Sequence, residues 1–170
     1  VGTCHSGAIT SPLNPGTYCG LSFGSGTYTL NPGIYVISGG TLKINSNSVI
    51  NGTGVMFYLT NGATLQLNGS AKINISAATT GTYAGVLFFG DRTMPNAVQK
   101  INGDATSLMT GAIYFPSQEL DLLGNFSGAG GCMQVVADTI YYTGSSTFRN
   151  DCSAAGLKTI NVAGSVRLVE

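Results

Sequence analysis

The hexapeptide LNPGTY at residues 13–18 recurs as LNPGIY at residues 30–35, seventeen residues further along the chain. Near-identical repetition at a period of about 20 residues is typical of solenoids, in which one short unit stacks on the next. Proline fixes φ and the following glycine accepts positive φ, so each copy is expected to turn the chain at a corner between two strands. The repeat therefore predicts a stack of coils.

Short apolar or alternating segments predict the strands of these coils. TLKIN (41–45) and TLQLN (64–68) alternate in the manner of half-buried strands. A second series is more apolar, and its members, 31, 26 and about 20 residues apart, are expected to be equivalent strands: GVMFYL (54–59), GVLFFG (85–90), GAIYFP (111–116) and CMQVVA (132–137).

The last step of this series predicts a regular coil of 20 residues. It places Leu120 opposite Ile140, Leu122 opposite Tyr142 and, by the same step, Ala112 opposite Cys132. Helical periodicity is almost absent from the chain, because glycine, proline or asparagine interrupts each segment.

The predicted fold is an all-β, right-handed parallel β-helix with irregular coils of about 17–31 residues. We expect one domain over residues 1–170, with N-terminal capping coils at 1–29, stacked coils at 30–150 and a C-terminal coil at 151–170. Asn-Gly pairs at 51–52, 61–62, 68–69 and 102–103 are interpreted as turns. Because such pairs equally suit β-hairpins, an antiparallel β-sandwich is the alternative fold.

Aromatic residues recur at matching positions of the apolar segments. The simpler expectation is an interior stack formed by Phe57, Phe88 and Phe115 or by their neighbours Tyr58, Phe89 and Tyr114. An exposed ladder that stacks on sugars is the alternative, and the sequence does not decide between the two faces.

Composition restricts the possible partners. Only 8% of the residues are charged, against about 25% in an average globular domain, and seven basic residues balance seven acidic ones. This predicts no nucleic-acid or anionic-lipid partner. The apolar runs are far shorter than the 18 residues that suggest a membrane span, so none is predicted in this chain. Because Val1 is followed at once by polar residues, we expect an upstream region of the full-length protein to be absent.

The four cysteines are Cys4, Cys19, Cys132 and Cys152. Their even number and the absence of Cys-x-x-Cys spacing favour disulfides in an oxidising compartment, with free buried thiols as the alternative. We predict the pair Cys132–Cys152, one coil apart, and the pair Cys4–Cys19, which would close the N-terminal coil.

The chain resembles a known family in several sequence motifs. These are the blocks YAGVLFFGDR (83–92) and TGAIYFP (110–116), the LNPGxY copies, a cysteine before QVVADTI and a closing VRLVE. It is similar to the C-terminal β-helical region of Tad (tight-adherence) pilus-associated, TadG-like proteins, from about Leu13 to Glu170. The resemblance implies a secreted or bacterial cell-surface protein whose relatives carry an upstream membrane helix and a Tad-type segment, and whose chain ends near Glu170. It implies no catalytic or ligand-binding residue.

Candidate sites for chemistry are few, and neither a cofactor nor a metal ion is predicted. Asp91, Arg92, Lys100 and Asp104 surround one long turn, which is expected to be a structural loop or, alternatively, a surface-binding loop for an anion or sugar. Glu119 and Asp121 are expected to point outward from one strand. A polysaccharide lyase or hydrolase acting through Asp91, Asp104, Glu119 or Asp121 is the less favoured enzymatic hypothesis.

The sequence therefore predicts a non-enzymatic, extracellular structural or adhesive module associated with the cell surface or a pilus-type appendage. Expected partners are further copies of the chain, joined end to end into fibres, or other cell-surface or pilus proteins. The alternative is a glycan- or surface-binding module that uses a flat face rich in Thr, Ser and Asn.

Overall fold

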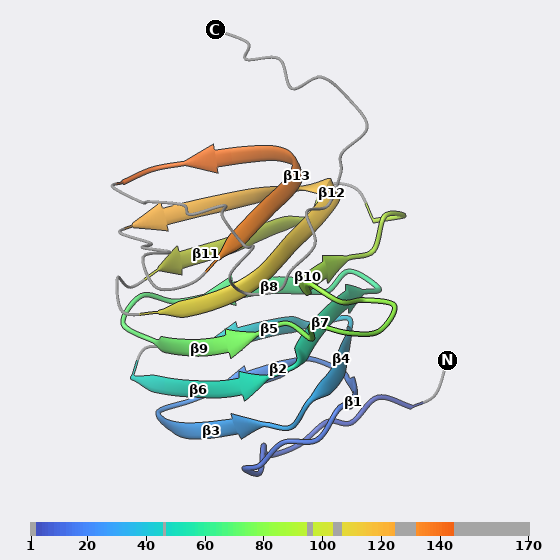
Figure 1. Cartoon of the computed structure of the whole chain (residues 1–170), viewed down its shortest axis with the longest axis vertical. Helices are drawn as coiled ribbons and strands as arrows, with labels where there is room; N and C mark the ends of the chain where they lie inside the picture. The colour runs from blue at the N-terminus through green and yellow to red at the C-terminus, as the bar shows by residue number, and fades with distance from the viewer. Residues whose placement is uncertain (1–2, 46, 95–96, 104–106, 125–131, 145–170) are drawn as a thin grey trace, which may run out of the picture.

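The computed structural model describes residues 3–45, 47–94, 97–103, 107–124 and 132–144. These residues form an all-β parallel solenoid of about five turns (Figure 1), and no helix occurs among them. The predicted parallel β-helix is confirmed, and the antiparallel sandwich is wrong, because every strand pair in the described ranges is parallel.

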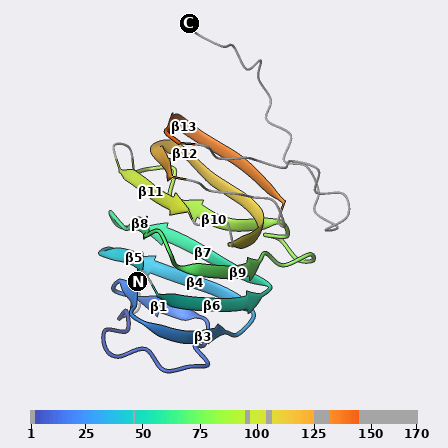
Figure 2. The ribbon, with the colours of Figure 1, turned by 90° about the vertical axis from the view of Figure 1, so that its left-hand side faces the viewer.

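Three strand columns form the three faces of the solenoid, and Figure 2 shows the coils stacked along its axis. Face A contains β1 (Gly16–Tyr18), β4 (Gly33–Ser38), β7 (Val55–Thr60) and β10 (Val86–Gly90). Face B contains β2 (Leu21–Phe23), β5 (Thr41–Ile44), β8 (Thr64–Leu67) and β11 (Val98–Gly103). Face C contains β3 (Gly26–Leu30), β6 (Ser48–Thr53) and β9 (Lys72–Ser76).

Two long strands continue across the corners of the coil. β12 (Leu108–Gly124) pairs with β9 on face C, then with β10 on face A, and finally with β11 on face B. β13 (Met133–Tyr142) follows β12 across faces A and B. These strands join the three faces into one sheet.

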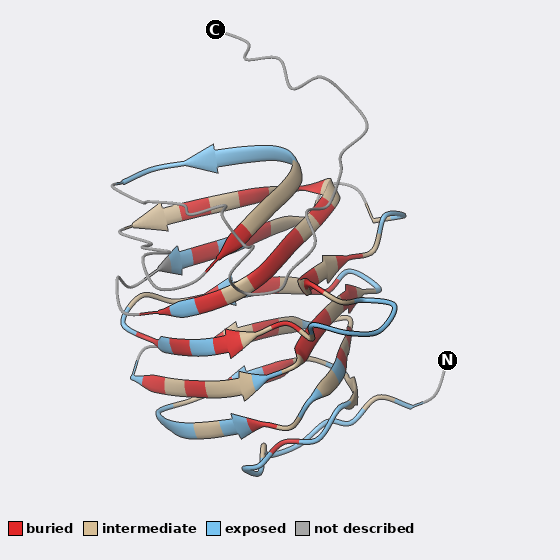
Figure 3. Ribbon diagram, viewed as in Figure 1, coloured by how far each residue is buried: buried red, intermediate tan, exposed pale blue. Residues whose placement is uncertain are grey.

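The core is a stack of like residues, because parallel strands in register place equivalent side chains one coil apart. Tyr35, Phe57, Phe88 and Ile113 are register partners on face A, and all four are buried. Figure 3 shows buried and more exposed positions alternating along many strands, as expected for strands with one inner side.

The interior aromatic stack is confirmed. The ring centroids of Tyr35 and Phe57 lie 5.4 Å apart, and those of Phe57 and Phe88 lie 5.5 Å apart with an interplanar angle of 14°. Phe115 is also fully buried, although Ile113 takes the register position that follows Phe88.

The LNPGxY repeat forms corners whose two copies contact each other. In each copy the tyrosine hydroxyl donates to the asparagine carbonyl four residues earlier: Tyr18 to Asn14 at 2.5 Å and Tyr35 to Asn31 at 2.7 Å. The Asn31 side-chain amide donates to Asn14 Oδ1 at 2.7 Å. The repetition therefore supplies a hydrogen-bonded turn that stacks on its own copy.

Glycine in the second copy is required by a close approach as well as by its φ of 140°. A Cβ atom at Gly33 would lie 2.4 Å from Cγ of Pro15, the proline of the first copy. The predicted role of this glycine in the turn is therefore confirmed, and the structure adds a packing reason.

One detail of the expected spacing is wrong. Ala112 pairs with Gln134 rather than with Cys132, because this part of the coil contains 22 residues, and a register shift between Phe115 and Glu119 restores the predicted 20-residue step at Leu120.

Of the four Asn-Gly pairs, those at 61–62 and 68–69 lie at turns. The pairs at 51–52 and 102–103 lie within β6 and β11. Gly52 is needed for packing, since a Cβ atom there would lie 2.9 Å from Cγ2 of Val55.

The disulfide Cys4–Cys19 is confirmed, with a Cα–Cα distance of 5.0 Å. It ties residues before β1 to the first coil, where the amide of His5 also donates to the Thr17 carbonyl. Cys132 is disulfide-bonded as well. Its expected partner, Cys152, and the predicted C-terminal coil at 151–170 lie outside the described residues.

Candidate functional site

The outer surface of face A carries an apolar groove of about 310 Å³. β4, β7 and β10 supply most of its walls, and the segment between β9 and β10 supplies one further side chain. We call it the face-A groove, and it is lined by Ile34, Val36, Met56, Tyr58, Tyr83 and Phe89. Ile34 is 39% exposed and Tyr83 is 50% exposed, so the groove opens to solvent.

An outward row of rings continues from the groove along face A. The rings of Tyr58 and Phe89 meet edge to face, with centroids 5.6 Å apart, and those of Phe89 and Tyr114 are stacked with centroids 5.3 Å apart. The three residues are half-buried. The aromatic residues of the apolar strands thus divide between an interior stack and an outward row.

Arg92 lies over this outward row. Its guanidinium carbon is 5.8 Å from the ring centroid of Phe89 and 5.3 Å from that of Tyr114, within the range of cation–π attraction. The hydroxyl of Ser117 donates to the Arg92 carbonyl at 2.8 Å and helps fix the backbone there.

Asp91, next to Arg92, has a structural role. Its carboxylate accepts hydrogen bonds from the Thr93 amide at 2.9 Å and from the hydroxyls of Thr93 and Thr60 at 2.8 Å. These bonds, with that of the Thr93 amide the strongest, lower the pKa of Asp91. The carboxylate therefore anchors the segment after β10 to the preceding coil.

The structure places three of the four residues of the predicted surface loop. Lys100 lies on β11 of face B, where its ammonium group is 3.8 Å from the Asp121 carboxylate. Asp104 lies outside the described residues. Only Asp91 and Arg92 remain at the start of the turn, and Arg92 is the one that reaches face A.

Glu119 and Asp121 alternate on β12 with buried Leu120 and Leu122, as the outward orientation predicted from the sequence requires. The ion pair with Lys100 engages Asp121. Across the described residues, no group of three or more His, Cys, Asp or Glu side chains is placed to hold a metal ion.

Buried amides form a relay that the sequence did not indicate. The amide of Leu65 donates to Gln99 Oε1 at 2.6 Å, Gln99 Nε2 donates to Gln118 Oε1 at 3.0 Å, and Gln118 Nε2 donates to the Asp91 carbonyl at 3.3 Å. Both glutamines are buried. The relay links β8, β11, β12 and the residue that follows β10 through side-chain hydrogen bonds.

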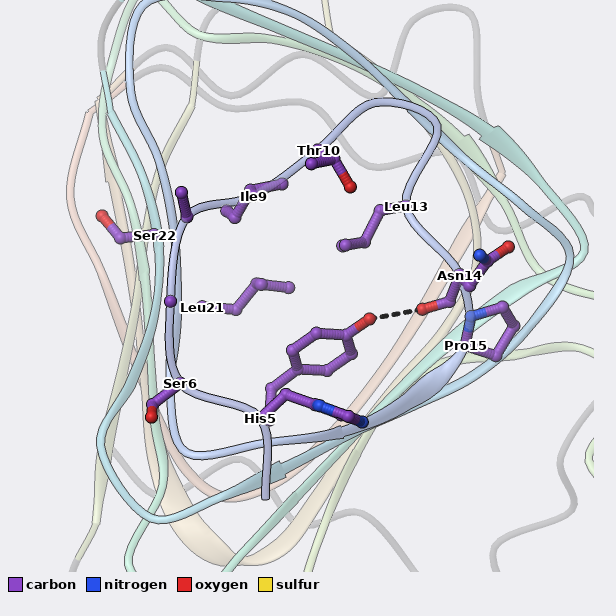
Figure 4. A pocket seen from close by; sticks show the side chains of 13 residues that line it. His5, Ser6, Ile9, Thr10, Leu13, Asn14, Pro15, Leu21 and Ser22 are labelled. Atoms are coloured by element: carbon purple, nitrogen blue, oxygen red, sulfur yellow. Dashed lines mark hydrogen bonds between the residues drawn. The ribbon is translucent and has the colours of Figure 1, made fainter. Parts of the chain in front are cut away.

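A cavity of about 340 Å³ opens at the N-terminal end of the solenoid (Figure 4). Leu21 of the first coil points into it, Tyr18 also lines it, and Ile9 and Leu13 come from the segment that precedes β1. The cavity therefore lies where the hydrophobic core ends at the first coil.

Outward polar side chains hydrogen-bond to their equivalents in the next coil. The hydroxyls of Thr41 and Thr64 are 3.0 Å apart on face B. Asn74 donates to Asn51 at 3.2 Å on face C, and Asn68 donates to Asn45 at 3.3 Å at a corner. The abundance of threonine and asparagine is explained in part by these ladders.

The face-A groove was not predicted from the sequence, although one segment carries a signal for it. The segment GVMFYL (54–59) has bulky apolar residues on both sides of the strand, whereas a strand with a polar outer side alternates. Met56 and Tyr58 are the outward residues, and they indicate an apolar outer surface. The contribution of Tyr83 depends on a turn whose path the sequence does not predict.

No protein-family model, curated protein or solved structure matches this chain. The solenoid fold expected from the resemblance to TadG-like proteins is present. Among the described residues, no helix has the length and apolar character needed to cross a bilayer.

Proposed function

We propose that this chain is a non-enzymatic structural module of the bacterial cell surface or of a pilus-type appendage, and that its solenoids associate end to end. The observation that carries the proposal is the interior ring stack, which extends from Tyr18 through Tyr35 and Phe57 to Phe88. A close-packed column that crosses successive coils resists bending, as a spacer or fibre subunit requires.

The charge and the disulfides support the same proposal. With only 8% charged residues, neighbouring solenoids repel each other little. Cys4–Cys19 and the disulfide of Cys132 fit an oxidising compartment, such as the cell exterior. The resemblance to TadG-like proteins supports the association with a pilus system.

The carboxylates favour a structural role over polysaccharide cleavage. The Asp91 carboxylate is held by Thr60 and Thr93, and that of Asp121 is paired with Lys100. An assay of the wild-type chain on acidic polysaccharides tests this point. The non-enzymatic proposal would be overturned if the wild type cleaves such a polysaccharide and the activity is lost after joint replacement by alanine of Asp91, Asp104, Glu119 and Asp121.

Negative-stain electron microscopy and sedimentation velocity of the concentrated protein test end-to-end association. We expect fibres of uniform width, about that of one solenoid, and their loss in Ile9→Lys, which places a charge in the N-terminal cavity. Thr27→Lys is the matched control, because Thr27 is exposed on the lateral face C. Monomers at all concentrations, or equal effects of both lysines, would contradict the proposal.

Glycan binding by the polar faces is the alternative function. The columns Thr41–Thr64 and Asn51–Asn74 supply hydroxyl and amide groups on flat faces, although these groups already hydrogen-bond along the column. A glycan array probed with the labelled chain tests this alternative, and an absence of signal above background would remove it.

A further inference from the structure

The face-A groove differs chemically from the polar ladders on the other two faces. None of its six lining residues is charged, and Ile34 and Tyr83 expose 39% and 50% of their surface. Exposed apolar surface that is concave and continuous commonly marks a binding site. A volume of about 310 Å³ is at the lower end for ligand sites, and it suits one or two large side chains.

Tyr83 is held in place by its own turn. The segment between β9 and β10 contains hydrogen bonds from the Val86 amide to the Tyr83 carbonyl at 3.1 Å and from the Gly85 amide to the Ala78 carbonyl at 2.7 Å. Gly81 and Gly85 have φ values of 94° and 85°, which other residues rarely adopt. The wall of the groove is therefore formed before any ligand arrives.

Arg92 supplies a positive charge beside the groove. It stacks on Phe89, which also lines the groove, and no described residue forms an ion pair or hydrogen bond with its guanidinium group. The adjacent Asp91 carboxylate is occupied by Thr60 and Thr93. The guanidinium donors therefore remain available for a carboxylate, which arginine can bind through two parallel hydrogen bonds.

The arrangement of the rings favours a peptide over a sugar. A sugar needs an open ring face, but the faces of Phe89 and Tyr114 are stacked on each other and lie under Arg92. The groove itself offers the side chains of Ile34, Val36 and Met56 beside the half-exposed ring of Tyr83. Such a surface packs well against an apolar side chain.

We propose that the face-A groove binds an extended peptide segment of a partner protein, in which a large apolar side chain is followed within a few residues by a carboxylate. The apolar side chain enters between Ile34 and Tyr83, and the carboxylate pairs with Arg92. This site lies on the side of the solenoid, so it is independent of end-to-end association and of the outcome of the fibre experiment.

The test is an NMR titration of the whole chain, labelled with ¹⁵N, against end-blocked synthetic hexapeptides. The probes are a library with tryptophan, phenylalanine or leucine at one position and glutamate two to four positions later, and a matched library with glutamine in place of glutamate. We expect shifts of amides in β4, β7, β10 and the Tyr83 turn, with about tenfold tighter binding of the best glutamate peptide than of its glutamine counterpart.

Two pairs of matched variants locate the contacts. Tyr83→Ala should abolish binding, while Tyr141→Ala, which removes another exposed tyrosine on β13, should leave it unchanged. Arg92→Gln should remove the preference for glutamate, and Lys100→Gln, which removes a positive charge on face B, should preserve it. Unshifted amides in β5 and β6 verify that each variant is folded.

Several outcomes would overturn the proposal. These are the absence of saturable shifts on face A with every peptide, equal affinity for glutamate and glutamine peptides, or insensitivity to Tyr83→Ala. If the same amides shift when the chain alone is diluted, the occupant of the groove is a second copy of the chain. If they shift only when an oligosaccharide is added, the occupant is a glycan. Either result would also refute the proposal of a peptide ligand.

Discussion

The coils from Gly33 to Ser76 and the coils from Val86 to Gly124 stack by different means. In the first region the strands pair in unbroken register, with partners such as Gly33 and Val55 or Thr41 and Thr64. In the second region the inserted segments 77–85 and 91–94 lie outside the paired strands, and buried Gln99 and Gln118 add side-chain hydrogen bonds between coils.

The two regions also differ in what they expose on face A. The regular coils are held by backbone hydrogen bonds and stacked apolar side chains. The inserted segments disturb that pattern and require buried amides, and they also bring Tyr83 and Arg92 to face A. Groups suited to binding thus occur where the repeat is broken, as is common for loops on rigid scaffolds.

The largest effect is expected in the regular region. Phe57→Ala removes the ring between Tyr35 and Phe88 and leaves a cavity in the core, which should lower the free energy of unfolding by about 3–5 kcal/mol. Urea unfolding followed by circular dichroism measures this change. Tyr58→Ala, at the adjacent outward position, should cost clearly less; equal losses would show that the interior stack is not the main source of stability.

Gln99→Leu tests the means by which the inserted region is stabilised. The leucine leaves the Leu65 amide and the Gln118 side chain without their partner, so a loss of about 1–3 kcal/mol in unfolding free energy is expected. Gln66→Leu is the control, because Gln66 points outward on β8, and it should change stability by less than about 0.5 kcal/mol. An unchanged stability in Gln99→Leu would refute the structural role of the relay.

Tyr35→Phe isolates the contribution of the LNPGxY corner. It removes a hydroxyl whose single hydrogen is shared between the Leu13 carbonyl, at 2.8 Å, and the Asn31 carbonyl, so a loss of about 1 kcal/mol is expected. Tyr28→Phe is a control, since Tyr28 contributes its ring to an edge contact with Phe23. The two variants should differ, because only Tyr35 ties two corners together.

The same tyrosine predicts a pH dependence. Burial, and to a lesser extent neighbouring Tyr18, raises the pKa of Tyr35 to about 12, against 10.0 for an exposed tyrosine. The neutral form is therefore favoured in the folded state, and its stabilisation is complete below pH 10 and declines as the pH rises towards 12. Unfolding measured from pH 8 to 12 should show this decline, and Tyr35→Phe should reduce it; an identical pH profile in the variant would contradict the assignment.

The regular region was largely predictable from the sequence, and the inserted region was not. Alternation in TLKIN and TLQLN identified β5 and β8, and the spacing of apolar segments identified β7 and, in the second region, β10 and β12, because stacked coils repeat the same local pattern. Gln99 and Gln118 gave no signal, since an interior glutamine is recognisable only once its partners are known. The position of Lys100 gave no signal either, because it depends on the pairing of β11 with β8 and β12 on face B.

The smallest effect is expected at the Lys100–Asp121 pair, on the outer side of the inserted coils. The charged groups are 3.8 Å apart and the lysine side chain is half exposed, so solvent screens the pair and the coupling should be below about 1 kcal/mol. A double-mutant cycle of Lys100→Ala and Asp121→Asn measures the coupling free energy, and Lys43→Ala, two coils away on face B, controls for loss of a lysine. A coupling well above 1 kcal/mol would mean that outward charges help hold the irregular coils together. A small coupling would place the stability of these coils in the buried amides and the core rather than in their outward charges.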